Sequence, residues 1–144
     1  DIKKYLYDKG QGTDTDGKYV GTISYTRGLM ISMLQVEAIR AAQEKYGKGK
    51  HMTPEQVRWG FEHLDLTQDR LNQLGFGEIM RPVKTSCEDH MGTDWARIIQ
   101  WDGKKFKVVS DWYQSDKKFV NPLVKELAAK YAKEKNITPR TCKD

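Results

Sequence analysis

Two runs of alternating apolar and polar residues, separated by Asp102-Gly103, most constrain what this chain can fold into. The segment reads WARIIQWDGKKFKVVSDW, from Trp95 to Trp112. An Asp-Gly pair suits the positive φ angles of a tight hairpin turn, and strict alternation places every second side chain on one face. The pattern therefore predicts a β-hairpin late in the chain.

Helical patterns surround this hairpin. Strong helix formers between Leu29 and Tyr46 predict a helix, and the β-branched and aromatic residues of Tyr19–Gly28 predict an extended segment before it. Thr53 and Gln56 have the spacing of a capping box, which predicts a second helix. Asn121, followed by a proline, predicts the start of a final helix.

Length and charge exclude several classes of protein. The chain has 144 residues, enough for one domain with a core, and a net charge of +5. Its lysines are scattered and mostly accompanied by Asp or Glu, so we expect a diffuse basic surface and no nucleic-acid partner. No apolar run approaches the roughly 20 residues of a membrane span. Without a visible signal peptide, we expect a mature chain or a fragment.

The segment SCEDHMG, Ser86 to Gly92, concentrates the reactive residue types of the chain. Cys87, Asp89 and His90 are competent metal ligands, but no CxxC or HxxxH spacing accompanies them. A Cys87–His90 nucleophile pair is a second interpretation. A third is a long-range disulfide between Cys87 and Cys142, which would place the chain in an oxidising compartment, although two separate buried thiols are also compatible with the sequence. We expect no metal site.

The segment SYTRG, before the expected helix at Leu29, is a candidate for binding an anion. A helix N-terminus offers N–H groups and a positive dipole, Arg27 could bind a carboxylate, and Tyr25 could stack on a flat ligand. The alternative is that Arg27 lies on the surface and Tyr25 in the core. The candidate ligand-binding residues are Ser24, Tyr25, Thr26, Arg27 and Gly28. No phosphate-binding or dinucleotide-binding motif is present, so we expect no cofactor.

The order of the longer motifs resembles one protein family. YTRGLMISMLQVEAIRAAQEKYG, MTPEQVRWGFEHLDL, the segment from LGFGEIMRP to VVSDW, and VNPLVKELAAKYAKEKNI together look like the C-terminal part of an ABC-transporter substrate-binding protein. The type is the branched-chain amino acid (Leu/Ile/Val-binding-like) periplasmic binding protein, type I. The resemblance covers nearly the whole chain.

This resemblance implies an α/β fold, in which two three-layer lobes enclose a ligand. The chain would be a C-terminal fragment, with residues 1–80 a mostly helical part of one lobe and residues 81–144 the late strands, hairpin and final helix. It would bind an amino acid or a small, possibly aromatic, organic acid in the periplasm and deliver it to a membrane permease, without acting as an enzyme. The resemblance also implies a Cys87–Cys142 disulfide, and ligand contacts within Ser24–Gly28.

Two other functions stay open from the sequence. One is a small secreted enzyme that uses Cys87, Asp89 and His90. The other is the ligand-sensing domain of a receptor, which would share the fold.

Overall fold

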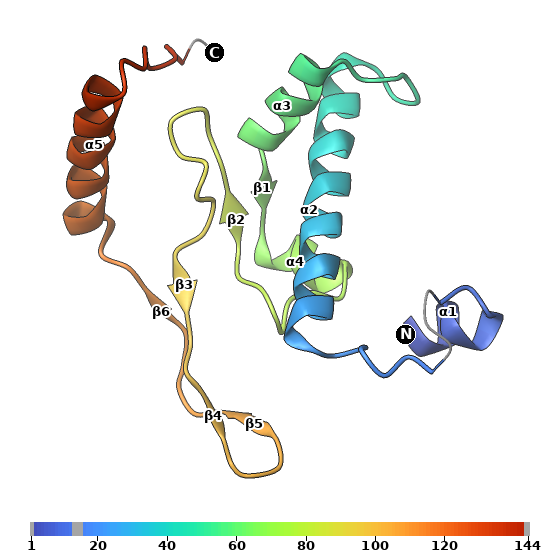
Figure 1. The fold of residues 1–144 in the computed structure, drawn as a ribbon. Helices are drawn as coiled ribbons and strands as arrows, with labels where there is room; N and C mark the ends of the chain where they lie inside the picture. Colours follow the sequence, from blue (N-terminus) through green and yellow to red (C-terminus); the bar gives the residue numbers. More distant parts are fainter. Residues whose placement is uncertain (1, 13–15, 143–144) are drawn as a thin grey trace. The chain divides into compact units, whose positions relative to one another are not determined.

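The computed structural model describes residues 2–12 and 16–142. They form two compact units, one ending at His63 and the other beginning at Leu64 (Figure 1). Each unit is described by itself below.

The first unit is helical throughout its regular structure. Its elements are a short helix α1 (Ile2–Tyr5), a 3₁₀ turn η1 (Tyr7–Lys9), the long helix α2 (Ile23–Tyr46) and the helix α3 (Pro54–Glu62). Helix α3 begins with the capping box expected from the sequence: the Thr53 hydroxyl accepts from the Gln56 N–H at 3.3 Å, and the Gln56 side chain accepts from the Thr53 N–H at 3.0 Å.

Small residues bring α2 and α3 into close contact. Ala38 and Ala42 on α2 are completely buried. Gly60 on α3 lies so near that a Cβ atom there would fall 2.1 Å from the carbonyl oxygen of Ala38. Only a residue without a side chain fits at this point, so Gly60 sets the distance between the two helices.

One buried charge lies on α2. Glu37 is only 2% exposed, and its carboxylate accepts from Nε and Nη2 of Arg40 at 3.1 and 2.9 Å. The hydrogen bond to Glu37 raises the pKa of Arg40. A buried carboxylate needs such charge-assisted bonds, because an unpaired charge in the interior is strongly unfavourable.

Helix α2 begins earlier than the sequence pattern predicts. Thr22 is its N-cap and accepts from the N–H of Tyr25 at 3.4 Å, so the helix starts at Ile23 instead of Leu29. The expectation that Tyr19–Gly28 is extended is therefore wrong from Ile23 onward. A hydroxyl cap stabilises the first turn, and this outweighs the weak preference of β-branched and aromatic residues for strands.

The second unit combines short strands with two helices. Strand β1 (Asp65–Leu66) pairs with β2 (Val83–Lys84), β3 (Trp95–Ala96) with β6 (Tyr113–Gln114), and β4 (Ile99–Trp101) with β5 (Phe106–Val108), each antiparallel. The helices are α4 (Gln68–Gln73) and α5 (Lys117–Glu134). The buried apolar residues of this unit belong to its first elements: Leu64, Leu66, Leu71, Met80 and Val83.

The β-hairpin lies where the sequence predicts it, with a longer loop. Trp101 pairs with Phe106, which leaves four residues in the turn. The Asp102 carboxylate accepts from the N–H groups of Lys104 and Lys105, both at 2.9 Å, and Gly103 has a φ of +98°. The Asp-Gly pair thus forms the turn, and the aspartate side chain closes it.

A stacked cluster links the segments on either side of this hairpin. The Trp112 ring lies 5.0 Å from the guanidinium carbon of Arg81 and 4.5 Å from that of Arg97. Cation–π contacts of this kind hold the connection between β5 and β6 against residues that directly precede β2 and β4.

The final helix also begins earlier than predicted. Its N-cap is Asp116, whose carboxylate accepts from the N–H of Lys118 at 3.0 Å, so α5 starts at Lys117 and not after Asn121. Pro122 lies inside the helix, where it removes a single backbone hydrogen bond. The cap stabilises a first turn that the proline signal alone did not reveal.

The three-layer α/β lobes expected from the family resemblance stay a prediction. Every strand pair in the described residues is antiparallel and belongs to a separate two-stranded sheet. The assignment of residues 1–80 and 81–144 to parts of two lobes likewise stays a prediction. The late hairpin and the C-terminal helix are both present.

Candidate functional site

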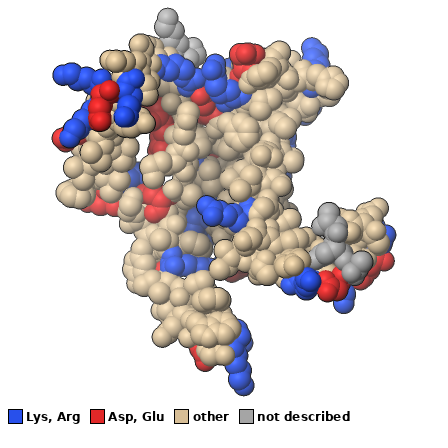
Figure 2. All heavy atoms as spheres, in the orientation of Figure 1, with Lys and Arg blue, Asp and Glu red and all other residues tan. Residues whose placement is uncertain are grey.

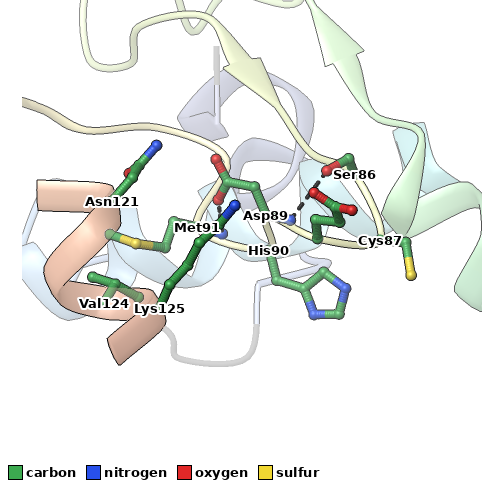
Figure 3. A pocket seen from close by; sticks show the side chains of 9 residues that line it. Ser86, Cys87, Asp89, His90, Met91, Asn121, Val124 and Lys125 are labelled. Carbon is green, nitrogen blue, oxygen red and sulfur yellow. Dashed lines mark hydrogen bonds between the residues drawn. The ribbon is translucent and has the colours of Figure 1, made fainter. Parts of the chain in front are cut away.

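The loop between β2 and β3 gathers the reactive residues of SCEDHMG. It is a tight turn: Ser86 Oγ accepts from the N–H of Asp89 at 3.0 Å, and the N–H of Ser86 donates to the Asp89 carbonyl at 2.9 Å. Asp89 Oδ1 in turn accepts from the N–H of Met91 at 3.0 Å (Figure 3). The serine and aspartate side chains therefore shape the backbone of this loop.

Gly92 ends the loop in a conformation that favours glycine. Its φ is +72°, and a Cβ atom would lie 2.9 Å from Cγ1 of Val83. The Gly92 carbonyl accepts from the N–H of Lys84 at 2.8 Å, which returns the chain alongside β2. Gly92 therefore allows the end of the loop to lie directly against β2.

Cys87 and Cys142 form a disulfide with a Cα–Cα distance of 5.7 Å. The bond joins the 86–91 loop to the chain beyond α5. Cys87 consequently has no thiol, so the enzyme alternative, with Cys87 as nucleophile beside Asp89 and His90, loses its nucleophile. Within the described residues, no group of three His, Cys, Asp or Glu side chains could hold a metal ion.

A hollow of about 550 Å³ lies between this loop and α5. Figure 3 shows Asn121, Val124 and Lys125 on the helix side and the residues of the loop on the other. The lining mixes two carboxylates (Glu88 and Asp89) with the Lys125 amine and the Asn121 amide. Such a lining can offer both donors and acceptors to a polar group, from a protein or from a small molecule.

Asp94 anchors the base of α5 next to this hollow. Its side chain is 10% exposed and accepts from Gln114 Nε2 at 3.0 Å and from Ser115 Oγ at 2.8 Å, with Lys117 Nζ 3.8 Å away. Partial desolvation raises the pKa of Asp94, but these hydrogen bonds and the lysine charge outweigh it, so the pKa lies below its usual 3.8. Asp94 is thus ionised near neutral pH and links β3, β6 and α5.

Sequence reasoning missed Asp94, Asn121 and Lys125 as neighbours of the 86–91 loop. About 30 residues separate the loop from α5 along the chain, and no spacing rule relates them. The one signal available was the second cysteine, because a Cys87–Cys142 bond requires the end of α5 to return to the loop.

The predicted ligand-binding residues lie elsewhere, on α2 in the first unit. Ser24, Tyr25, Thr26, Arg27 and Gly28 all have helical backbone, with Tyr25 and Thr26 half-buried and the other three exposed. The N–H groups of the first turn therefore belong to Ile23, Ser24 and Tyr25, and not to a helix that starts after Gly28. A ligand-binding role for these five residues stays a prediction.

Among residues 2–12 and 16–142, no helix combines the length and the apolar character that crossing a membrane requires.

No family model and no curated protein matches this chain. A solved structure does: a crystal structure described as an ABC transporter permease from the Pseudomonas fluorescens group, with 42% sequence identity and a TM-score of 0.90. The similarity covers 99% of this chain and 34% of the other. The chain thus spans about a third of the length of the protein that it matches.

This match corrects the family resemblance. The similar protein is described as a permease, so the interpretation of this chain as a periplasmic substrate-binding protein is wrong, as is that of a small-molecule binder whose partner is a permease. The motifs behind the resemblance are helix caps, apolar stripes and a hairpin turn, which report secondary structure and not function. The relation to ABC transporters agrees with the match.

Proposed function

We propose that this chain is one part of a longer ABC-transporter component of the permease kind, which takes part in moving a solute across a membrane. The observation that supports this proposal is the 42% identity to the described permease, sustained over 99% of the chain with a TM-score of 0.90. Sequence identity at this level over nearly the whole of this chain is evidence of shared ancestry, whereas the fold alone would not indicate function.

We also propose that this part of the protein performs no chemical step. Cys87 is consumed in the disulfide. The Ser86 hydroxyl and the Asp89 carboxylate form hydrogen bonds with the backbone of their own loop. The loop therefore has a structural role, with α5 held next to it.

The disulfide further supports a location in an oxidising compartment, and we propose the periplasm. Disulfides persist outside the reducing cytosol. Treating intact cells with a membrane-impermeant reductant and then with a thiol-reactive mass tag should label both Cys87 and Cys142. Labelling without reductant would contradict the proposed location.

The transport role can be tested in the native host by deleting the gene and measuring uptake of a panel of radiolabelled solutes. We expect uptake of at least one solute to fall to background, and the full-length gene to restore it. Uptake should also stop when cellular ATP is depleted, because an ABC transporter is driven by ATP.

A second measurement tests the component itself. Cross-linking in living cells, followed by purification of the full-length protein, should recover an ATP-binding subunit in amounts comparable to the protein. Unchanged uptake of every solute, together with no recovered ATP-binding subunit, would overturn the proposal.

A further inference from the structure

Helix α5 has an apolar stripe that nothing in the described residues covers. Its members recur every four residues, so they lie along one side of the helix, and all are exposed, from 46% at Leu123 to 69% at Phe119. We call these residues the outer stripe: Phe119, Leu123, Leu127 and Tyr131.

The neighbouring side of the same helix lies near the 86–91 loop without being covered by it, because Val124 is itself 46% exposed. Val120 and Val124 line the two hollows beside residues 86–94, so that side of α5 faces the loop. The outer stripe lies next to that side, since Phe119 and Leu123 directly precede Val120 and Val124 along the helix. The apolar residues of α5 therefore extend beyond the side of the helix that lies near the loop.

The β4–β5 hairpin has a second uncovered apolar surface. Ile99 pairs with Val108 and Trp101 with Phe106, and these two pairs share one face because their positions alternate with the polar pair Gln100–Lys107. The Trp101 and Phe106 rings lie 5.2 Å apart, yet the side chains are 54% and 56% exposed. Figure 2 shows most of the hairpin surface in the colour of uncharged residues, with basic side chains at its tip.

A two-stranded hairpin is only marginally stable in water unless its apolar face packs against something. Contiguous exposed apolar surface of this kind marks an interface. The hairpin and the outer stripe belong to the same unit, and no residue of β4, β5 or α5 is buried.

We propose that the outer stripe and the apolar hairpin face bind the remainder of the same polypeptide. The argument for this occupant is length. The match covers 34% of the similar structure, so about twice as many of its residues lie outside the matched part as within it. Polypeptide of that size can supply a complementary apolar surface in every molecule. The proposal rests on the part of the proposed function that makes this chain one part of a longer polypeptide; it concerns folding and does not depend on the transport role.

Matched substitutions in the full-length protein test the outer stripe. Leu127→Glu places a charge in the stripe, whereas Ala129→Glu places the same charge on an exposed position across the helix. We expect Leu127→Glu to increase local opening of α5 about tenfold or more, measured by amide hydrogen exchange, because the proposal buries this leucine against the rest of the polypeptide. Ala129→Glu should leave the exchange rates unchanged.

The hairpin offers a second matched pair. Ile99→Glu lies on the apolar face and Gln100→Glu on the opposite one. We expect faster exchange in β4 and β5 for Ile99→Glu alone. Equal exchange for the members of both pairs would overturn the proposal.

The unaltered full-length protein gives a test that no misfolded variant can obscure. Its α5 amides should exchange slowly when the protein is monomeric by sedimentation and free of lipid. Protection that appears only in a dimer would assign the stripe to a second copy. Protection that requires anionic vesicles would assign it to a membrane surface, and either result would overturn the proposal.

Discussion

The two long helices of this protein are held in place by different means. Helix α2 buries Met33, Glu37, Ala38 and Ala42, and its alanines lie against a glycine of α3. Helix α5 has no buried residue along its 18 positions. It is fixed at its start by the Asp116 cap and the Asp94 hydrogen bonds, and beyond its end by the Cys87–Cys142 bond.

The difference shows that a helix can form through local contacts whether or not one of its faces is packed. Both helices have caps and strong helix formers, so both form locally. Only α2 has its packing partner within these residues, and a helix without a packed face depends on local contacts and covalent links. The comparison predicts that α5 responds most to loss of the disulfide, and α2 to changes in side-chain volume.

Removing the disulfide should have the largest effect. In the Cys87→Ser, Cys142→Ser double variant, the unfolded chain regains the freedom of a 55-residue loop, which costs roughly 4 kcal/mol of stability in the chain-entropy model. Urea unfolding followed by circular dichroism measures this loss. Reduced wild-type protein is the control and should unfold like the double variant; an unchanged midpoint on reduction would show that the disulfide does not stabilise the fold.

Adding one methyl group between α2 and α3 should have the next largest effect. Gly60→Ala brings a Cβ atom into the Ala38 carbonyl, so the helices must separate or bend. Overpacking of this kind costs about 1–3 kcal/mol. Urea unfolding of the variant measures the cost. Stability equal to wild type would mean that α2 and α3 adjust freely, and it would remove the contrast with α5.

Removing the charge of Asp94 should matter less than removing the disulfide, and in a pH-dependent way. Asp94→Asn weakens its interactions with Gln114, Ser115 and Lys117, for an expected loss of about 1.5–3 kcal/mol near neutral pH. Because the folded-state pKa of Asp94 lies below the usual value, its stabilisation is complete above pH 3.8 and disappears as the pH falls through the folded-state value.

Unfolding of Asp94→Asn and wild type at a series of pH values checks this. The stability difference between them should shrink toward zero in acid. The pKa values of Asp102 and Glu55 are also lowered, but both groups titrate in wild type and variant alike. Their contributions therefore cancel in the stability difference. A difference that stays constant down to acid pH would mean that the carboxylate charge of Asp94 contributes nothing.

The elements that could be predicted from the sequence are those whose signals are local. The Thr53 capping box and the Asp102-Gly103 turn involve residues within four positions of each other, and both are present. The close contact of Gly60 with Ala38 and the approach of Lys125 to the 86–91 loop could not be predicted, since they depend on how distant segments pack.

Helix starts were predicted poorly for a related reason. Pro122 predicts a later start of α5 than the Asp116 cap gives it. The sequence pattern also predicts an extended segment that ends at Gly28, although Gly28 lies within α2. One residue type can favour two local structures, and the cap that decides between them lies several residues away.

Gly28 provides the smallest and most discriminating test of the comparison. It has helical backbone in α2, and a Cβ atom there would have nothing within 4 Å, in contrast to Gly60. Gly28→Ala should therefore stabilise the protein by about 0.5–1 kcal/mol, because alanine loses less conformational freedom in a helix. Urea unfolding of Gly28→Ala and Gly60→Ala compares the same chemical change at two positions. The expected changes in the free energy of unfolding have opposite signs. A loss of stability in Gly28→Ala would place a packing partner against the start of α2, and the two helices would then differ less than their buried residues suggest.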